Sequence, residues 1–125
     1  MGFGFEDLLV WKRAIQFAGD VIEVLERLPG PYKHYRLIEQ VESAVTSVAS
    51  NIAEGKGRYS KKEFVQFLYI ARGSLYETVS LLALFEQRRW IGSEEHQRFE
   101  SQAREIAKMI NGLLQSLRRP APKLA

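Results

Sequence analysis

Hydrophobic residues recur every three or four positions in four separate stretches of this chain, the spacing that places them on one face of an α-helix. The stretches cover about residues 5–28, 35–54, 61–90 and 94–118. No segment alternates hydrophobic and polar residues for long enough to predict a β-strand. Four amphipathic helices joined by short turns predict an all-α, antiparallel up-down-up-down four-helix bundle over residues 1–119, with residues 120–125 as a flexible tail.

The first predicted helix carries two hydrophobic stripes. One follows a heptad spacing and is expected to face the bundle core: Leu8, Trp11, Ile15, Ala18, Ile22 and Leu25. The other lies about 110° further round the helix; it comprises Val10, Ala14, Phe17, Val21, Val24 and Leu28. The third predicted helix likewise has Ile70, Leu81 and Leu84 opposite its inward stripe.

A single four-helix bundle cannot bury both sides of a helix, so these extra hydrophobic side chains predict a homo-oligomer. Full burial of each one against another copy would stabilise the assembly by roughly 1.5 to 3 kcal/mol. The candidate interface comprises Val10, Phe17, Val21, Val24, Ile70, Leu81 and Leu84. The alternative is that these residues belong to the hydrophobic area that every protein surface retains.

Residues 50–63 are expected to end the second helix, form a turn and begin the third helix. Gly55 and Gly57 can adopt the positive φ that closes a helix. Ser60 and Glu63 have the spacing of a capping box, in which each side chain bonds a free backbone N–H of the new helix.

Cations crowd this turn, with no acid between Glu54 and Glu63; they are Lys56, Arg58, Lys61 and Lys62. Lys61 and Lys62 are expected at a helix N-terminus, where the helix dipole disfavours each positive charge by some tenths of a kcal/mol. This unfavourable placement indicates that the basic corner has a use other than stability. A solvated loop is the alternative interpretation.

A stripe of small and polar residues follows the second helix, formed by Gln40, Ala44, Ser47, Asn51 and Glu54. On the third helix, Arg72 lies on the same face as Tyr69 and Tyr76. We expect Glu54 or Asn51 to reach Arg72 across the helix pair, because such a bond satisfies groups that are costly to bury alone. The functional alternative is an aromatic and arginine patch that stacks bases and pairs phosphates.

The composition is that of one ordinary globular domain, with 125 residues, 46% of them hydrophobic and 26% charged. The absence of cysteine excludes disulfides, thiolate metal sites and cysteine nucleophiles. No hydrophobic run approaches the roughly 18 to 20 residues of a membrane span, which predicts a soluble, cytoplasmic protein. The formal net charge of +3 does not by itself indicate a nucleic-acid partner.

Nothing in the sequence assembles catalytic or metal-binding chemistry. His34 and His96 lack the spacing that places two metal ligands on one helical face, and the serines have no evident base. The Gly55-x-Gly57 pair follows a helix instead of a strand and lacks the Gly-Lys-Ser/Thr ending of a phosphate loop. We therefore expect no enzyme activity, catalytic residue, metal, cofactor or small-molecule substrate.

Several segments, taken in order, resemble one protein family. They are Phe5-Glu-Asp-Leu-x-Val-Trp-Lys-x-Ala, Leu37-x-x-Gln40, Ser47-x-x-Ser-Asn-Ile-Ala-Glu-Gly-x-Gly-Arg and Phe64-x-x-Phe-Leu-x-Ile-Ala-Arg-Gly-Ser-Leu-x-Glu. The resemblance covers about Phe5 to Ile91. It is to the four-helix-bundle proteins named for open reading frames in intervening sequences of bacterial 23S ribosomal RNA. Relatives include the accessory variability determinant of diversity-generating retroelements.

The resemblance implies a bundle that assembles as a pentameric, barrel-like ring, has no enzymatic activity, and associates with RNA or with nucleic-acid-handling proteins. By position, the polar motif of the family falls on Gln40, Asn51, Glu54, Arg72 and Ser74. The basic turn of the family falls on residues 56–62. The candidate nucleic-acid-binding residues are therefore Lys56, Arg58, Lys61, Lys62 and Arg72. The alternative function is a scaffold that docks a partner enzyme such as a reverse transcriptase.

Overall fold

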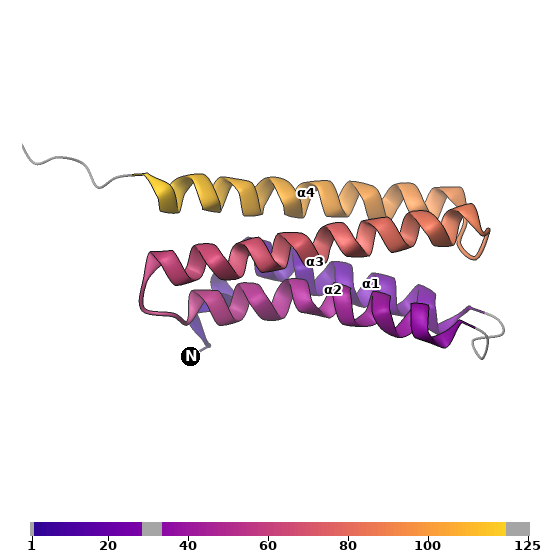
Figure 1. Cartoon of the computed structure of the whole chain (residues 1–125), viewed down its shortest axis with the longest axis horizontal. Helices are drawn as coiled ribbons and strands as arrows, with labels where there is room; N and C mark the ends of the chain where they lie inside the picture. The colour runs from indigo at the N-terminus through magenta and orange to yellow at the C-terminus, as the bar shows by residue number, and fades with distance from the viewer. Residues whose placement is uncertain (1, 29–33, 120–125) are drawn as a thin grey trace, which may run out of the picture.

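Four α-helices run alternately in opposite directions and lie side by side along their lengths (Figure 1). The computed structural model describes residues 2–28 and 34–119. Its elements are a short 3-10 helix η1 (Gly4–Asp7) and the helices α1 (Leu9–Glu26), α2 (Tyr35–Lys56), α3 (Lys61–Gln87) and α4 (Ser93–Arg118). The predicted all-α up-down-up-down bundle is confirmed, and the described residues contain no strand. The predicted tail, residues 120–125, lies outside them.

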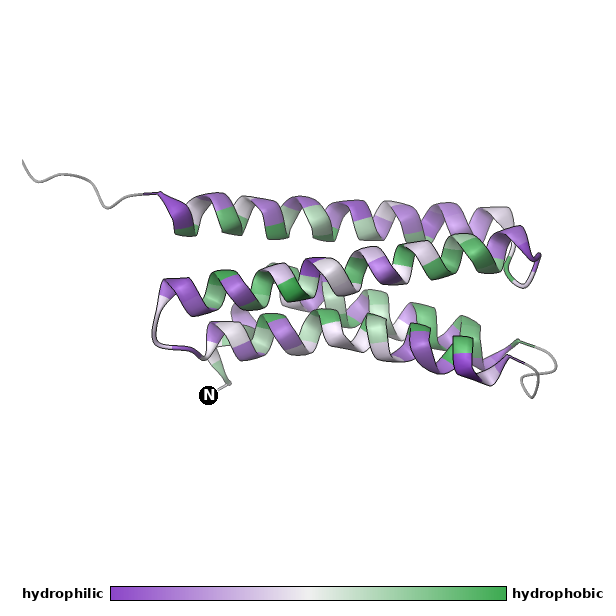
Figure 2. Cartoon of the chain, in the orientation of Figure 1, coloured by the Kyte–Doolittle hydropathy of each residue, from purple (hydrophilic) through white to green (hydrophobic). Residues whose placement is uncertain are grey.

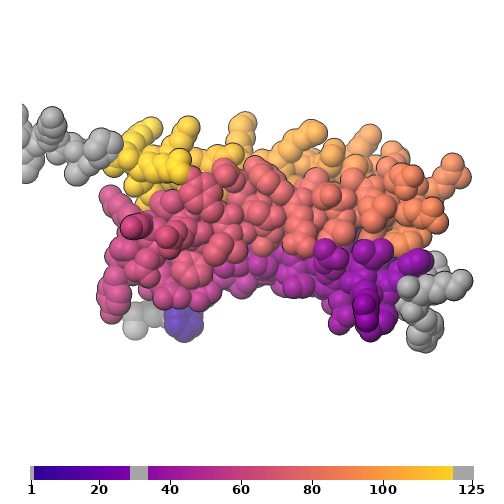
Figure 3. Space-filling model, in the orientation of Figure 1, coloured from indigo at the N-terminus to yellow at the C-terminus, as the bar shows by residue number. Residues whose placement is uncertain are grey.

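Each helix packs against its neighbours in the chain, and α4 closes the bundle against α1. The closest pair is α2 and α3, and in the space-filling view α3 covers most of one face between α4 and α2 (Figure 3). Hydrophobic side chains of all four helices form one core cluster. Figure 2 marks the hydrophobic positions of each helix in green. The largest fully buried side chains include Phe17, Ile52, Leu68, Leu75, Leu82, Phe85, Phe99, Ile106 and Ile110.

Helix α3 ends three residues earlier than predicted because Arg89 adopts a left-handed backbone conformation, with φ 62°. The Trp90 N–H donates to the Phe85 carbonyl at 2.8 Å, and the Arg89 N–H donates to the Glu86 carbonyl at 2.9 Å. The rings of Phe85 and Trp90 pack with their centroids 5.0 Å apart. This is a Schellman ending with its usual hydrophobic contact, formed without the glycine that normally occupies the left-handed position.

Both stripes of α1 contribute to the core, and the second stripe is buried more deeply than the heptad stripe that we expected there. In the second stripe, Val10, Ala14, Phe17, Val21 and Val24 are all at most 4% exposed. In the heptad stripe, Ala18 and Leu25 are buried, and Leu8, Trp11 and Ile22 are half-buried against the core. Ile15 is the exposed member of the heptad stripe, at 46%. The α4 side is occupied by Arg13 and Asp20, which bond side chains of α4.

The candidate oligomer interface therefore changes. The prediction that Val10, Phe17, Val21 and Val24 contact another copy is wrong, because the core of a single chain already buries them. On α3, by contrast, Ile70 is 52% exposed, Leu84 is exposed and Leu81 is half-buried. A role of these three residues between copies stays a prediction.

Gly55 lies inside α2 at its contact with the first turns of α3. A Cβ atom at this position would lie 2.6 Å from the Phe67 Cβ and 2.9 Å from the Phe64 Cδ1, closer than non-bonded carbons tolerate. Neither Gly55 nor Gly57 has the positive φ that we predicted, and Gly57 has φ −79°. Gly55 is required by the close approach of two helices, not by a reversal of the chain.

Replacing this glycine tests the close approach. We expect Gly55→Ala to lower the free energy of unfolding by about 1 to 3 kcal/mol, because the added methyl overpacks the contact of α2 with α3. Gly73→Ala is the matched control, since nothing lies within 4 Å of a Cβ at that exposed position of α3. Denaturant titration should show Gly73→Ala to be stabilising by about 0.5 to 1 kcal/mol. Equal effects of the two substitutions would contradict the assignment.

Candidate nucleic-acid interface

The basic turn lies at one end of the bundle, together with two other segments. The antiparallel order of the helices brings η1, the end of α2, the start of α3 and the end of α4 to this end (Figure 1). The opposite end holds the end of α3, with Arg88 and Arg89, and the start of α4.

A serine cap starts α3 immediately after the turn. The Ser60 hydroxyl oxygen accepts from the Glu63 N–H at 3.1 Å, which satisfies one free donor of the helix. The Ser60 hydroxyl in turn donates to the Glu63 carboxylate at 3.1 Å. Only the serine half of the predicted capping box is therefore present. In the described residues, the Glu63 carboxylate contacts the Ser60 hydroxyl and Arg58 instead of the Ser60 N–H.

Arg58 is held in place within this end of the bundle. Its guanidinium donates to the Glu54 carboxylate at 3.0 Å and lies 3.9 Å from the Glu63 carboxylate. The same group lies over the Phe67 ring, 4.9 Å from the centroid. Arg58 therefore ties the end of α2 to the start of α3, and two carboxylates offset its charge.

The three lysines of the turn differ from Arg58. Lys56, Lys61 and Lys62 are exposed, and none forms an ion pair with a carboxylate of residues 2–28 or 34–119. Their charges are free to meet an anionic partner. The turn thus divides into one structural cation and three available ones.

A groove of about 460 Å³ lies beside the turn. The groove forms where η1 packs against α2. Its lining includes the aromatic and basic side chains of Phe3, Phe5, Lys56, Arg58 and Tyr59, together with the carboxylates of Glu54 and Glu63 that pair with Arg58. Phe3 is 73% exposed and stacks on Phe5 with centroids 5.7 Å apart. Tyr59 is fully exposed. Exposed aromatic rings beside cations can stack unpaired bases while the cations pair the phosphates.

Sequence reasoning missed the aromatic part of this site. Tyr59 stands among the four cations of the turn, so the alternation of aromatic and basic residues was a usable signal. Phe3 and Phe5 are more than fifty residues away along the chain, and only the bundle topology brings them to the turn.

The predicted polar motif separates into different contacts, and the predicted bond from Glu54 or Asn51 to Arg72 is wrong. Glu54 binds Arg58, and the Asn51 amide donates to the Ser47 carbonyl and hydroxyl, both at 2.8 Å. Arg72 instead donates to the Asn111 side-chain oxygen of α4 at 2.9 Å. The reason is the helical position of Arg72, which lies on the α4 side of α3 and not on the α2 side.

The remaining members of the motif tie α2 to α3. The Ser74 hydroxyl donates to the Ser47 hydroxyl at 2.9 Å, and the Gln40 amide donates to the Glu77 carboxylate at 3.0 Å. Of the predicted nucleic-acid-binding residues, Arg72 lies apart from the turn, about 16 Å along α3 from Lys61. It does not belong to the groove.

The described part of the chain contains no cluster of three His, Asp or Glu side chains that could hold a metal ion. Over the same residues, no helix is long and hydrophobic enough to cross a membrane.

A family model described as 23S rRNA-intervening sequence protein matches residues 6–112. The fold is also similar to a crystal structure of a protein with unknown function from the S23 ribosomal protein family of Bacteroides thetaiotaomicron. That similarity has a TM-score of 0.80 at 23% identity and covers 86% of this chain and 99% of that chain. At this identity it establishes the fold alone. No curated protein matches the sequence.

Proposed function

The chain belongs to the 23S rRNA-intervening sequence protein family, and from this premise we propose that it is a non-enzymatic protein of the bacterial cytoplasm that binds single-stranded RNA. Binding takes place at the end of the bundle that carries the α2–α3 turn. The observation that supports this proposal most is the groove in which exposed Phe3 and Tyr59 lie beside Lys56, which is unpaired in the described part of the chain.

The geometry favours a single strand over a duplex. Bases of a duplex are stacked on one another and cannot reach Phe3 or Tyr59, whereas unpaired bases of a loop or an end can stack on these rings. Lys61 and Lys62 continue the positive charge from the groove onto the first turn of α3. The net charge of only +3 makes this end, and not the whole surface, the region of attraction for phosphates.

Two sets of substitutions test the interface by fluorescence anisotropy with a labelled single-stranded RNA. Tyr59→Ala should weaken binding by roughly 5- to 150-fold, since stacking of one base contributes about 1 to 3 kcal/mol. Replacing Lys56, Lys61 and Lys62 together with Ala should reduce the slope of log K against log salt by about 2, if each lysine contacts one phosphate.

A triple replacement of Arg36, Arg88 and Lys108 with Ala is the matched control. It removes the same charge from exposed positions outside the turn. Its salt slope should equal that of the unaltered protein. No binding of RNA by the unaltered protein at low salt, or equal effects of the two triple variants, would refute the proposal.

We further propose that the protein forms a homo-oligomer through the outward stripe of α3, which comprises Ile70, Leu81 and Leu84. Ile70 and Leu84 are exposed in the single chain, and burying them would be favourable. The pentamer implied by the family resemblance would present five copies of the RNA-binding end. Several linked ends raise the effective concentration of sites along one RNA molecule.

Solution mass tests the assembly. Light scattering should give a multiple of the 14.4 kDa chain mass, fivefold for a pentamer. Ile70→Lys with Leu84→Lys should lower the mass to that of one chain, because two charges would then be buried at each interface. Leu9→Lys, at an equally exposed hydrophobic position of α1, should leave the mass unchanged. A single-chain mass for the unaltered protein would exclude this interface.

The alternative is a scaffold on which the stripe of α3 docks a nucleic-acid-handling enzyme such as a reverse transcriptase. The exposed Ile70 and Leu84 are the observation that favours it. A single-chain mass combined with retention of such an enzyme at a salt concentration that abolishes RNA binding would support the scaffold.

A further inference from the structure

Two arginines stack on one tyrosine where α3 meets the last turns of α4. The guanidinium carbon of Arg72 lies 4.9 Å from the centroid of the Tyr69 ring, and that of Arg118 lies 5.1 Å from the same centroid. Arg72 also lies 5.9 Å from the centroid of Tyr76, one turn further along α3. Stacking and the bond to Asn111 fix the orientation of the Arg72 guanidinium.

No carboxylate offsets this pair of charges within residues 2–28 and 34–119. Arg72 is half-buried, and its hydrogen bond in this part of the chain is to the neutral amide of Asn111. Arg118 likewise forms no ion pair there. A guanidinium has five N–H donors, and an oriented one with donors to spare is suited to bidentate contact with a phosphate.

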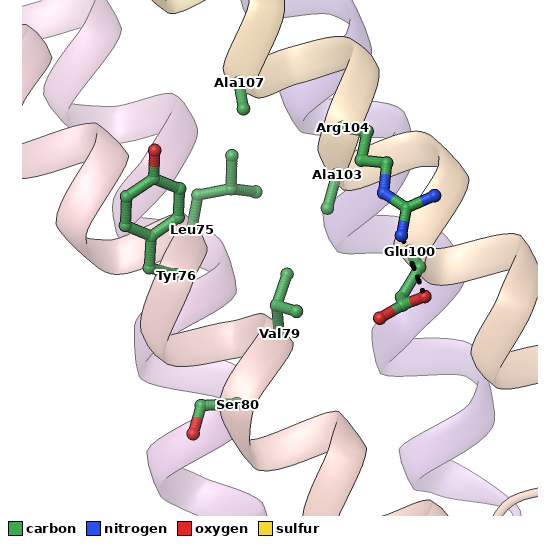
Figure 4. A pocket seen from close by; sticks show the side chains of 8 residues that line it. All are labelled: Leu75, Tyr76, Val79, Ser80, Glu100, Ala103, Arg104 and Ala107. Carbon is green, nitrogen blue, oxygen red and sulfur yellow. Dashed lines mark ion pairs between the residues drawn. The ribbon is translucent and has the colours of Figure 1, made fainter.

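A largely hydrophobic groove of about 350 Å³ adjoins the cluster, and Tyr76 belongs to both. Figure 4 shows Leu75, Tyr76 and Val79 of α3 on one side and Ala103, Ala107 and Arg104 of α4 on the other. The Arg104 guanidinium is paired with the Glu100 carboxylate at 3.5 Å on the α4 side. The groove thus offers a ring and small aliphatic side chains, with polar groups along one border.

We propose that this surface binds a nucleoside phosphate, with the phosphate on Arg72 and Arg118 and the base in the groove beside Tyr76. The cationic and hydrophobic parts of this surface are adjacent, as the phosphate and the base are in a nucleotide, and Tyr76 provides an exposed ring against which a base can stack. The site is separate from the α2–α3 turn and does not depend on RNA binding there.

Titration calorimetry with adenosine 5′-monophosphate, adenosine and inorganic phosphate tests the site on the full chain. The monophosphate should bind at least tenfold more tightly than adenosine or phosphate alone. Arg72→Gln should weaken its binding at least tenfold. Arg72→Lys should do the same, because an ammonium has neither the planar stacking surface nor the donor fork. Ala107→Leu should fill the groove, and it should therefore weaken binding of the monophosphate while leaving binding of inorganic phosphate unchanged.

Arg98→Gln is the matched control, because Arg98 also stacks on an aromatic ring, that of Phe99, at the other end of α4. It should bind the monophosphate like the unaltered protein, as should the lysine triple variant of the α2–α3 turn. Failure of RNA binding at the turn would therefore leave this result unaffected. If Arg72→Gln impairs folding in thermal melts, the exposed Arg118→Gln and Ala107→Leu carry the test.

Competition with a 5′-phosphorylated dinucleotide then distinguishes the source of the ligand. Displacement of the monophosphate would indicate that the site takes the end of a nucleic-acid strand. Lack of displacement would indicate that it takes a free nucleotide. Either result supports the site. No binding of the monophosphate, equal binding of inorganic phosphate, or an equal loss in Arg98→Gln would overturn the proposal.

Discussion

The close approach of α2 to α3 is the constraint on which the rest of this structure depends. Gly55 allows the end of α2 to lie against Phe64 and Phe67, where any side chain would collide. Further along the same contact, the hydroxyls of Ser47 and Ser74 bond one another. Small residues on facing helices let the two backbones come near enough for this packing. The short turn is therefore fixed at both ends, by the end of α2 and by the start of α3.

This constraint determines what the turn can present to a partner. Arg58 is fixed by the carboxylates of Glu54 and Glu63 and by the Phe67 ring, so it supports the turn. The neighbouring lysines and Tyr59 point into solvent without such contacts in the described structure. Because the backbone of the turn is already held in place, binding needs to order only these exposed side chains. The proposed RNA interface follows from this arrangement and not from the small net charge.

The sequence predicted the fold well, because hydrophobic spacing determines helices, and four of them with short turns have few ways to pack. It failed where two neighbouring faces were both hydrophobic, so Ile15 was placed in the core and Val21 at an interface. The spacing shows which residues share a face of a helix, but it does not show whether another helix of the bundle or another copy of the chain covers that face. Arg72 was misplaced for the same reason, since α4 and α2 flank opposite sides of α3. Gly55 was assigned to chain reversal because a tight helix contact leaves no local pattern in the sequence.

Hydrogen exchange measured at each amide tests most directly whether the α2–α3 pair is the most stable part of the bundle. The two helices make the most extensive contact in the bundle, so their facing amides near Ser47 and Ser74 should exchange only through global unfolding. The amides of α4, which contacts its neighbours less extensively, should exchange through openings of lower free energy. Faster exchange in α2 and α3 than in α4 would contradict this account.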